Sequence, residues 1–191
     1  SYSYFANKSA ADTLDEGDTV TDSFTYTVTD GTNSGTASIT ITVRGTNDPI
    51  TAVNDTDEVD EDKSITRSTS NSQELDHDDT DPDGDDASGS FTITAIRTGR
   101  ESSSSGNVTG TVGQVLNGTY GALTVSSNGS YTYAATRSGA DSLAAGATAI
   151  DYFTYTVRDH SGGDTDSAEL AITVTGVGPG AVNDTDTVAE N

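Results

Sequence analysis

The sequence predicts an all-β protein, built as antiparallel β-sandwiches in tandem. Short segments alternate apolar with polar residues, as half-buried strands do. Turn-forming residues separate these segments about every 8 to 12 positions, a spacing typical of sandwiches. No segment repeats its apolar residues with the period of an amphipathic helix. Long motifs also recur along the chain, which indicates a tandem arrangement.

The internal repeat has a constant offset through its first part. Residues 1–30 align with residues 130–159, each 129 positions later. After a two-residue insertion, ASITITVRG at 37–45 returns as AELAITVTG at 168–176. The two copies share the positions of their apolar residues, so we expect them to form the same strands.

The repeat also defines candidate domain boundaries. The motif AVNDTD occurs at 52–57 and again at 181–186. We therefore expect three units along the chain. Residues 1–50 would be the C-terminal part of a preceding repeat, 51–179 one complete sandwich repeat, and 180–191 the start of the next. The sequence thus has the pattern of a piece of a longer protein.

Individual strands follow from the alternation. In YFTYTV, the side chains of Phe153, Tyr155 and Val157 share one face, and the threonines between them take the other. AELAITV and FTITAI alternate in the same way. LTVSSNGSYTY reads as a hairpin, in which Asn128 and Gly129 would be the two residues with positive φ of a type I′ turn.

Charge and composition exclude several function classes. The chain has 31 acidic and 8 basic residues, a formal net charge of −23, so nucleic acid and anionic membrane surfaces would be repelled. It has no Cys, and no apolar run long enough for membrane insertion. His77 and His160 have no Cys or second His nearby, which argues against zinc. No nucleophile with its base is recognisable, so we expect no enzyme.

The most specific local motif is the acidic stretch DTDPDGDD. Asp79, Asp81 and Asp83, followed by Gly84, form a D-x-D-x-D-G pattern. Alternate side chains can converge on one Ca²⁺ in such a loop, and the glycine allows a sharp turn. The loop is not an EF-hand, because Ser90 stands where that motif has a bidentate Glu. The alternative is a solvated acidic loop that binds no ion.

A family resemblance adds to these observations. The ordered motifs GALTVSSNGSYTYAA, DYFTYTVRD, AELAITVTG and AVNDTD resemble the VCBS-type, cadherin-like repeats of large bacterial surface adhesins of the RTX type. The resemblance implies Ig-like sandwiches in tandem, secretion to the bacterial cell surface, and calcium between consecutive domains.

The resemblance also implies which residues would bind calcium at a joint. The linker element Asn47-Asp48-Pro49 would supply one Asp, the start of the next domain a Glu, and loops at the facing ends further Asp residues. The implied ligands are Asp30, Asp48, Glu61 and Asp159, and Asp55 and Asp57 are close enough in sequence to join them. At the second joint, GVGPG (176–180) has no Asp that corresponds to Asp48. The alternative for the first joint is a flexible acidic linker.

Together these features predict a structural function. We expect a calcium-stiffened extender repeat that projects an adhesive tip for attachment or biofilm formation. Its partners would be the neighbouring repeats, and another domain would bind the receptor, which the sequence does not identify. Two other classes stay open: a sandwich that binds a glycan or protein itself, and a spacer domain of a secreted hydrolase.

Overall fold

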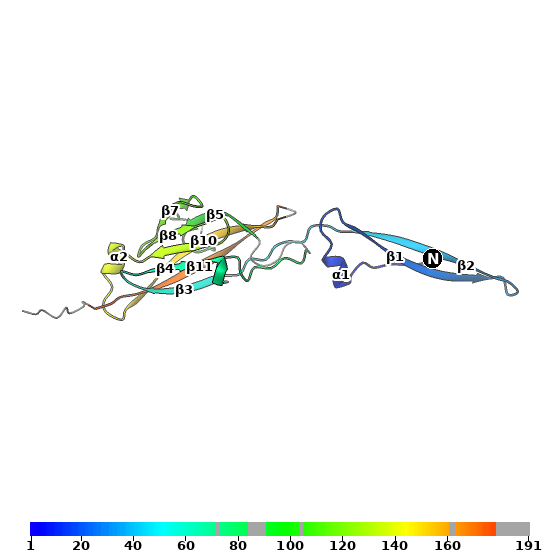
Figure 1. Ribbon diagram of the computed structural model, residues 1–191, viewed down its shortest axis with the longest axis horizontal. Coiled ribbons are helices and arrows are strands. Elements are labelled where there is room, and N and C mark those ends of the chain that lie inside the picture. Colours follow the sequence, from blue (N-terminus) through cyan, green and yellow to red (C-terminus); the bar gives the residue numbers. More distant parts are fainter. Residues whose placement is uncertain (72, 84–90, 104, 161–162, 179–191) are drawn as a thin grey trace, which may run out of the picture.

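The computed structural model describes residues 1–71, 73–83, 91–103, 105–160 and 163–178. They form a two-stranded N-terminal hairpin and a β-sandwich, which lie end to end with a short extended segment between them (Figure 1). The predicted start of a further repeat, 180–191, lies outside the described residues, as does Gly84 of the acidic loop. Among the described residues, no helix has both the length and the apolar composition needed to cross a membrane.

Two sheets make up the sandwich, as far as the structure describes it. The first has the order β3-β11-β10-β5-β6, with β3 (Asp55–Asp60), β11 (Thr165–Thr175), β10 (Thr148–Arg158), β5 (Thr92–Thr98) and β6 (Thr109–Gly110). The second has the order β4-β9-β8-β7, with β4 (Ser64–Arg67), β9 (Tyr131–Ala134), β8 (Ala122–Val125) and β7 (Val115–Asn117). The short helices are η1 (Thr69–Asn71) and α2 (Ser138–Asp141). This architecture confirms the predicted all-β sandwich.

One pair of described strands departs from the predicted antiparallel arrangement. β3 runs parallel to β11, with Asp55 opposite Leu170 and Val59 opposite Val174. A chain that enters a sandwich at one end and leaves at the other needs first and last strands of the same direction. The parallel pair therefore defines an entry end, where Ala52 N–H donates to Asp166 Oδ2 at 2.9 Å, and an exit end beyond Thr175.

The two sheets enclose one core. Phe153, Tyr155 and Val157 of β10 are fully buried, as the alternation predicts. Tyr133 of β9 packs edge-on against Phe153, with 6.2 Å between the ring centroids. Burial of each large apolar side chain stabilises the fold by about 1.5–3 kcal/mol. Because the chain has no disulfide, this core and any bound ligand must supply the stability of the repeat.

The β8–β9 turn differs from the predicted type I′ turn. Asn128 has no positive φ, whereas Gly129 has a φ of 75°. Gly129 N–H donates to Ser126 O at 3.1 Å, which closes a type I turn followed by a left-handed glycine. The loop is one residue longer than predicted, because Ser126 and not Ser127 pairs with Ser130. The carbonyl oxygen of Ser127 instead accepts Ile93 N–H from β5 at 2.9 Å.

The N-terminal part repeats the last hairpin of the sandwich. Its elements are α1 (Ser9–Asp12), β1 (Thr19–Thr29) and β2 (Ser34–Arg44). Phe24 lies opposite Ile39 in this hairpin, just as Phe153 lies opposite Leu170 between β10 and β11. Among the described strands, β1 and β2 pair only with each other.

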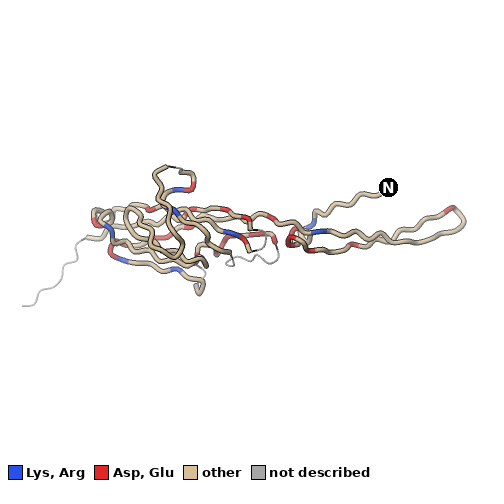
Figure 2. Tube along the Cα trace, turned by 90° about the horizontal axis from the view of Figure 1, so that it is seen from above, with Lys and Arg blue, Asp and Glu red and all other residues tan. Residues whose placement is uncertain are grey.

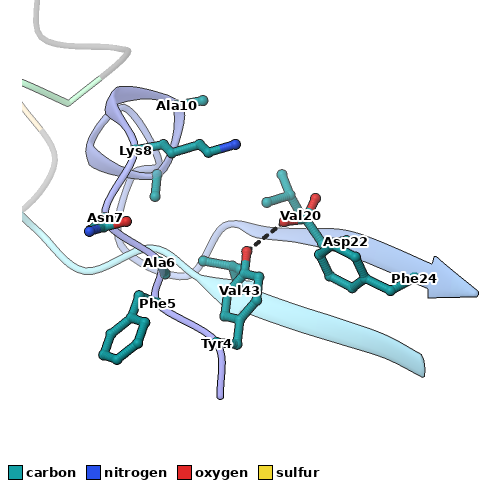
Figure 3. A pocket seen from close by; sticks show the side chains of 11 residues that line it. Tyr4, Phe5, Ala6, Asn7, Lys8, Ala10, Val20, Asp22, Phe24 and Val43 are labelled. Carbon is teal, nitrogen blue, oxygen red and sulfur yellow. Dashed lines mark hydrogen bonds between the residues drawn. The ribbon is translucent and has the colours of Figure 1, made fainter. Parts of the chain in front are cut away.

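A pocket lies between this hairpin and residues 4–11 (Figure 3). Within it, the Tyr4 hydroxyl donates to Asp22 Oδ2 at 2.6 Å, and the matching pair in the sandwich, Tyr133 and Asp151, has the same distance. The Asp151 carboxylate also accepts the backbone N–H groups of residues 119–121 at 2.8–3.0 Å. The pocket therefore corresponds to the place that this loop fills in the sandwich, and not to a ligand site.

Candidate functional site

The linker meets two acidic loops at the entry end of the sandwich. Asp48 N–H donates to Asp83 Oδ2 at 3.0 Å. The Asn47 side-chain amide donates to Asp164 Oδ2 at 3.0 Å and to Asp159 Oδ2 at 3.4 Å. Figure 2 shows Asp and Glu positions gathered where the linker reaches the sandwich. Three segments that are distant in sequence thus bring carboxylates to one joint.

The D-x-D-x-D loop is fixed against the entry segment. Thr51 and Thr80 form a two-residue antiparallel bridge, and Asp79 Oδ1 accepts Val53 N–H at 2.7 Å. Asp81 Oδ1 accepts Asp83 N–H at 2.9 Å, which tightens the turn around the alternate carboxylates. Asp79 and Asp83 are buried. Burial raises the free-energy cost of keeping these carboxylates ionised.

The β10–β11 turn supplies the third group of oxygens. The buried side chain of Asp159 accepts Gly163 N–H at 2.5 Å and Asp164 N–H at 3.1 Å. Gly163 adopts a φ of 77°, which a residue with a side chain adopts only with strain. This local geometry holds Asp159 and Asp164 beside the linker amide of Asn47.

A separate cluster of candidate ligand atoms lies near the start of β3. One ligand atom each of Asp55, His77 and Asp78 lies within 4.8 Å of the others. Burial raises the pKa of the Asp55 carboxyl to about 7, the charges of Asp78 and Asp79 add to the rise, and the hydrogen bond from Tyr155 opposes it. Asp55 Oδ2 accepts that hydroxyl at 2.7 Å. The sequence offered Asp55 as a ligand but no role for His77.

The pKa of the Asp79 carboxyl is raised in the same way as that of Asp55. Burial raises its pKa to about 7, and the charges of Asp78 and Asp76 add to the rise, whereas the Val53 N–H opposes it. Burial is the larger cause of both raised pKa values, and neighbouring negative charge at the entry end adds to it. A divalent cation bound there would favour the ionised carboxylates and reverse these shifts.

The structure corrects the prediction for Asp57. Its carboxylate accepts two hydrogen bonds from the Arg67 guanidinium, at 2.6 and 2.7 Å, and a third from the Tyr131 hydroxyl at 2.8 Å. This bidentate ion pair uses both carboxylate oxygens. Asp57 thus joins β3 to the second sheet and does not face the linker.

Glu61 is also placed differently from the prediction. Its N–H donates to Thr175 O at 2.8 Å, and its Oε1 accepts Val177 N–H at 2.8 Å. Glu61 therefore lies at the exit end, beyond the six-residue strand β3, whereas Asp48 lies at the entry end. A strand of six residues spans about 20 Å, so the two side chains cannot share one ion.

Asp30 is the third correction. It lies in the β1–β2 turn, exposed, and its Oδ1 accepts Asn33 N–H at 2.8 Å and Thr32 N–H at 2.9 Å. The 11-residue strand β2 separates it from Gly45, a span of about 36 Å. Figure 1 shows this turn pointing away from the sandwich. Its repeat mate Asp159 contacts the linker that enters its own repeat, so Asp30 would serve the joint before the N-terminal hairpin.

Some site residues were not predicted. Asp164 contacts the linker amide, and Asp78 and His77 lie beside Asp55. Asp164 lies in a turn of six residues, 159–164, where the N-terminal hairpin has four, 30–33. An acidic residue in a turn insertion was the available signal.

Comparison with known proteins identifies the family of this sandwich. The model of the bacterial cadherin-like domain matches residues 47–176, more than half of the 191 residues. The chain belongs to this family. The bacterial cadherin-like match begins at Asn47, so the linker contacts described above fall within the family unit. No curated protein sequence matches the chain.

Solved structures similar to this bacterial cadherin-like chain include two of one enzyme. They are an endo-fucoidan hydrolase, MfFcnA4 from glycoside hydrolase family 107, and a single-residue variant of it. Each is 23% identical and has a TM-score of 0.35, and the match covers 88% of this chain. This chain spans only 20% of the length of either hydrolase.

Proposed function

We propose that this repeat is a calcium-stiffened, non-enzymatic spacer of an extracellular bacterial adhesin. The cadherin-like family assignment supports an extracellular adhesion repeat. One observation carries the calcium role: the linker at Asn47 and Asp48 is hydrogen-bonded to carboxylates of both acidic loops at the entry end. These carboxylates come from the same end of the sandwich and contact the segment whose direction determines the angle of the joint.

The joint is short enough for such an ion to restrict it. Gly45 N–H donates to Asp18 O at 3.0 Å, and a side chain at Gly45 would clash with Asp15 O, so Gly45 belongs to the hairpin part. Asn47 is bound to the sandwich. Only Thr46 separates these two anchors. A cation that fixes Asp48 would therefore leave few rotatable bonds between neighbouring units.

Charge explains why calcium would matter for the whole array. Residues 52–180 contain 21 acidic and 6 basic residues, a net charge of −15. Consecutive repeats with this charge repel one another and favour extension without fixing direction. Calcium at joints built like the one at Asn47 and Asp48 would reduce the charge and fix the linker. Glu61, at the exit end, is positioned to serve the following joint.

Scattering tests the proposed stiffening. We expect small-angle X-ray scattering of the 191-residue protein in calcium to give an extended, rod-like profile, and chelation to reduce the maximum dimension. Asp48→Ala should resemble the chelated protein even in calcium, with the sandwich still folded. Asp30→Ala removes the same charge far from the joint and is the matched control.

Two scattering results would contradict the proposed stiffening. If wild-type protein keeps the same profile after chelation, calcium does not determine the stiffness of the joint. The same conclusion holds if Asp48→Ala and Asp30→Ala give equal profiles in calcium.

A further inference from the structure

Two buried acids lie apart from the linker, in the turn that precedes the D-x-D-x-D loop. Asp76 has no exposed surface and Glu74 has only 6%. Both carboxylate oxygens of Asp76 and Oε2 of Glu74 are shielded from solvent and make no hydrogen bond. The N–H groups of Asp76 and Phe91 are close enough to favour the charged carboxylate, but neither has hydrogen-bonding geometry with it.

Both acids border the same glycine. A side chain built on Gly129, in the β8–β9 turn, would clash with Asp76 Oδ1 and lie 3.2 Å from Glu74 Cβ. Between the two acids, Leu75 N–H donates to Gly129 O at 3.1 Å. This hydrogen bond fixes their segment against the turn. The two carboxylates are close enough for the charge of Glu74 to act on Asp76.

No compensating side chain is present among the residues that the structure describes. Neither Glu74 nor Asp76 forms an ion pair with a described Lys or Arg. His77 Nδ1 lies 2.9 Å from the backbone oxygen of Glu74, not from its carboxylate. Two buried carboxylates without a partner are among the most costly arrangements in a protein interior. A cation in direct contact with the three oxygens would remove that cost.

We propose that Glu74 and Asp76 bind a divalent cation of the calcium class within the repeat. The available ligands are carboxylate oxygens, which hard cations prefer, whereas zinc favours nitrogen and sulfur. Ca²⁺ tolerates an irregular set of oxygens and completes its coordination with water, while Mg²⁺ requires a near-ideal octahedron. The bound ion would connect the Glu74–His77 turn to the β8–β9 turn.

This Glu74–Asp76 site goes beyond the proposed function, because it lies within one sandwich and needs no neighbouring repeat. It would hold in place the chain that leads directly into Asp79, Asp81 and Asp83. Binding here would therefore order the loop that reaches the linker. The site stands even if the joint itself binds no calcium.

Calcium titration by calorimetry tests the site, with melting curves in EDTA and in calcium. The test variant is Glu74→Gln with Asp76→Asn, which keeps size and removes both charges. We expect it to bind one calcium ion fewer than wild type and to melt in EDTA at the wild-type temperature or higher. Asp141→Asn neutralises an exposed acid on α2, away from the proposed site; it is the surface control and should bind as wild type does.

Asp48→Ala separates this inference from the proposed function. It should lose calcium at the joint and keep the Glu74–Asp76 ion, so the two changes should add in a combined variant. An unchanged stoichiometry for the Glu74→Gln, Asp76→Asn variant would overturn the inference, whatever Asp48→Ala does.

A measurement on wild-type protein covers the case in which the variant does not fold. Mn²⁺ broadens the amide signals of nearby residues in nuclear magnetic resonance spectra. We expect substoichiometric Mn²⁺ to broaden Leu75 and Gly129, and excess Ca²⁺ to restore both signals. Sharp signals for both residues at saturating Mn²⁺ would contradict the site.

Discussion

The two hairpins of this protein share a sequence pattern and differ in burial. In β10–β11, Phe153 and Tyr155 are fully buried, whereas their repeat mates in β1–β2, Phe24 and Tyr26, are 49% and 45% exposed. The register is the same in both, since each strand pair is matched over 11 residues. Pairing is therefore determined within the hairpin. Burial depends on strands from the rest of a repeat.

The N-terminal part keeps some contacts of a complete repeat. Tyr4 and Phe24 pack edge-on at 6.2 Å, as Tyr133 and Phe153 do. Asp22, however, lacks the three backbone donors that Asp151 has, because no described loop covers it. If residues 1–50 end a preceding repeat, the earlier strands of that repeat would cover this face.

The largest expected effect concerns the aromatic pair at these matched positions. Phe153→Ala should lower the free energy of unfolding of the sandwich by about 3–5 kcal/mol, because it leaves a cavity in a closed core. Phe24→Ala should change the free energy of unfolding by less than about 0.5 kcal/mol, because the Phe24 ring is half exposed. Urea denaturation followed by circular dichroism measures both.

Similar losses for the two variants would break the comparison. They would show that the face of β1–β2 is buried in solution, for example against a second copy of the chain. Analytical ultracentrifugation of Phe24→Ala beside wild type would then detect the change in association.

The second expected effect concerns the turns of the two hairpins. Asp159→Asn should reduce the stabilisation that calcium gives the sandwich by up to about 2.7 kcal/mol, the value for one site at 100 times its Kd. Asp30→Asn, at the matched position of the other hairpin, should leave it unchanged, because that turn lies far from the joint. Melting curves with and without calcium measure both. A loss caused by Asp30→Asn would restore the original ligand assignment.

Much of the fold followed from the sequence, because alternation and the repeat are local properties. Phe153, Tyr155 and Val157 were predicted to share a buried face, and they do. The acidic loop could be found because its motif is contiguous. The β8–β9 turn was mispredicted because the contact between Ile93 and Ser127 comes from a different strand.

The composition of the joint could not be predicted in the same way. Glu61 follows Asp48 closely in the sequence, but sequence order does not reveal that β3 runs from the entry end to the exit end. The parallel pairing of β3 with β11 determines that direction. The repeat correctly pairs Asp30 with Asp159, yet only the fold shows that this turn meets the linker entering its own repeat.

The smallest expected effect is a difference in pH dependence between the two parts without calcium. The folded-state pKa values of Asp55 and Asp79 are about 7, against about 3.9 in an unfolded chain. The folded sandwich therefore binds these protons more tightly, so the contribution of the two groups to its stability is full below about pH 4 and is lost as pH rises through about 7. Asp30 has the opposite sign, since hydrogen bonds from Asn33 and then Thr32 lower its pKa. Its contribution is lost only as pH falls below its unfolded value of about 4.

Melting curves in EDTA at pH 5.5 and 7.5 would show this difference. The sandwich should melt a few degrees higher at pH 5.5, while amide exchange in β1–β2, corrected for its intrinsic pH dependence, should indicate equal stability at both values. Calcium should reverse the order for the sandwich, because the ion competes with protons for the same carboxylates and binds better at pH 7.5. A sandwich that melts higher at pH 7.5 in EDTA would mean that lysine or arginine compensates the entry-end acids in solution. The cation would then lose its electrostatic reason to bind there.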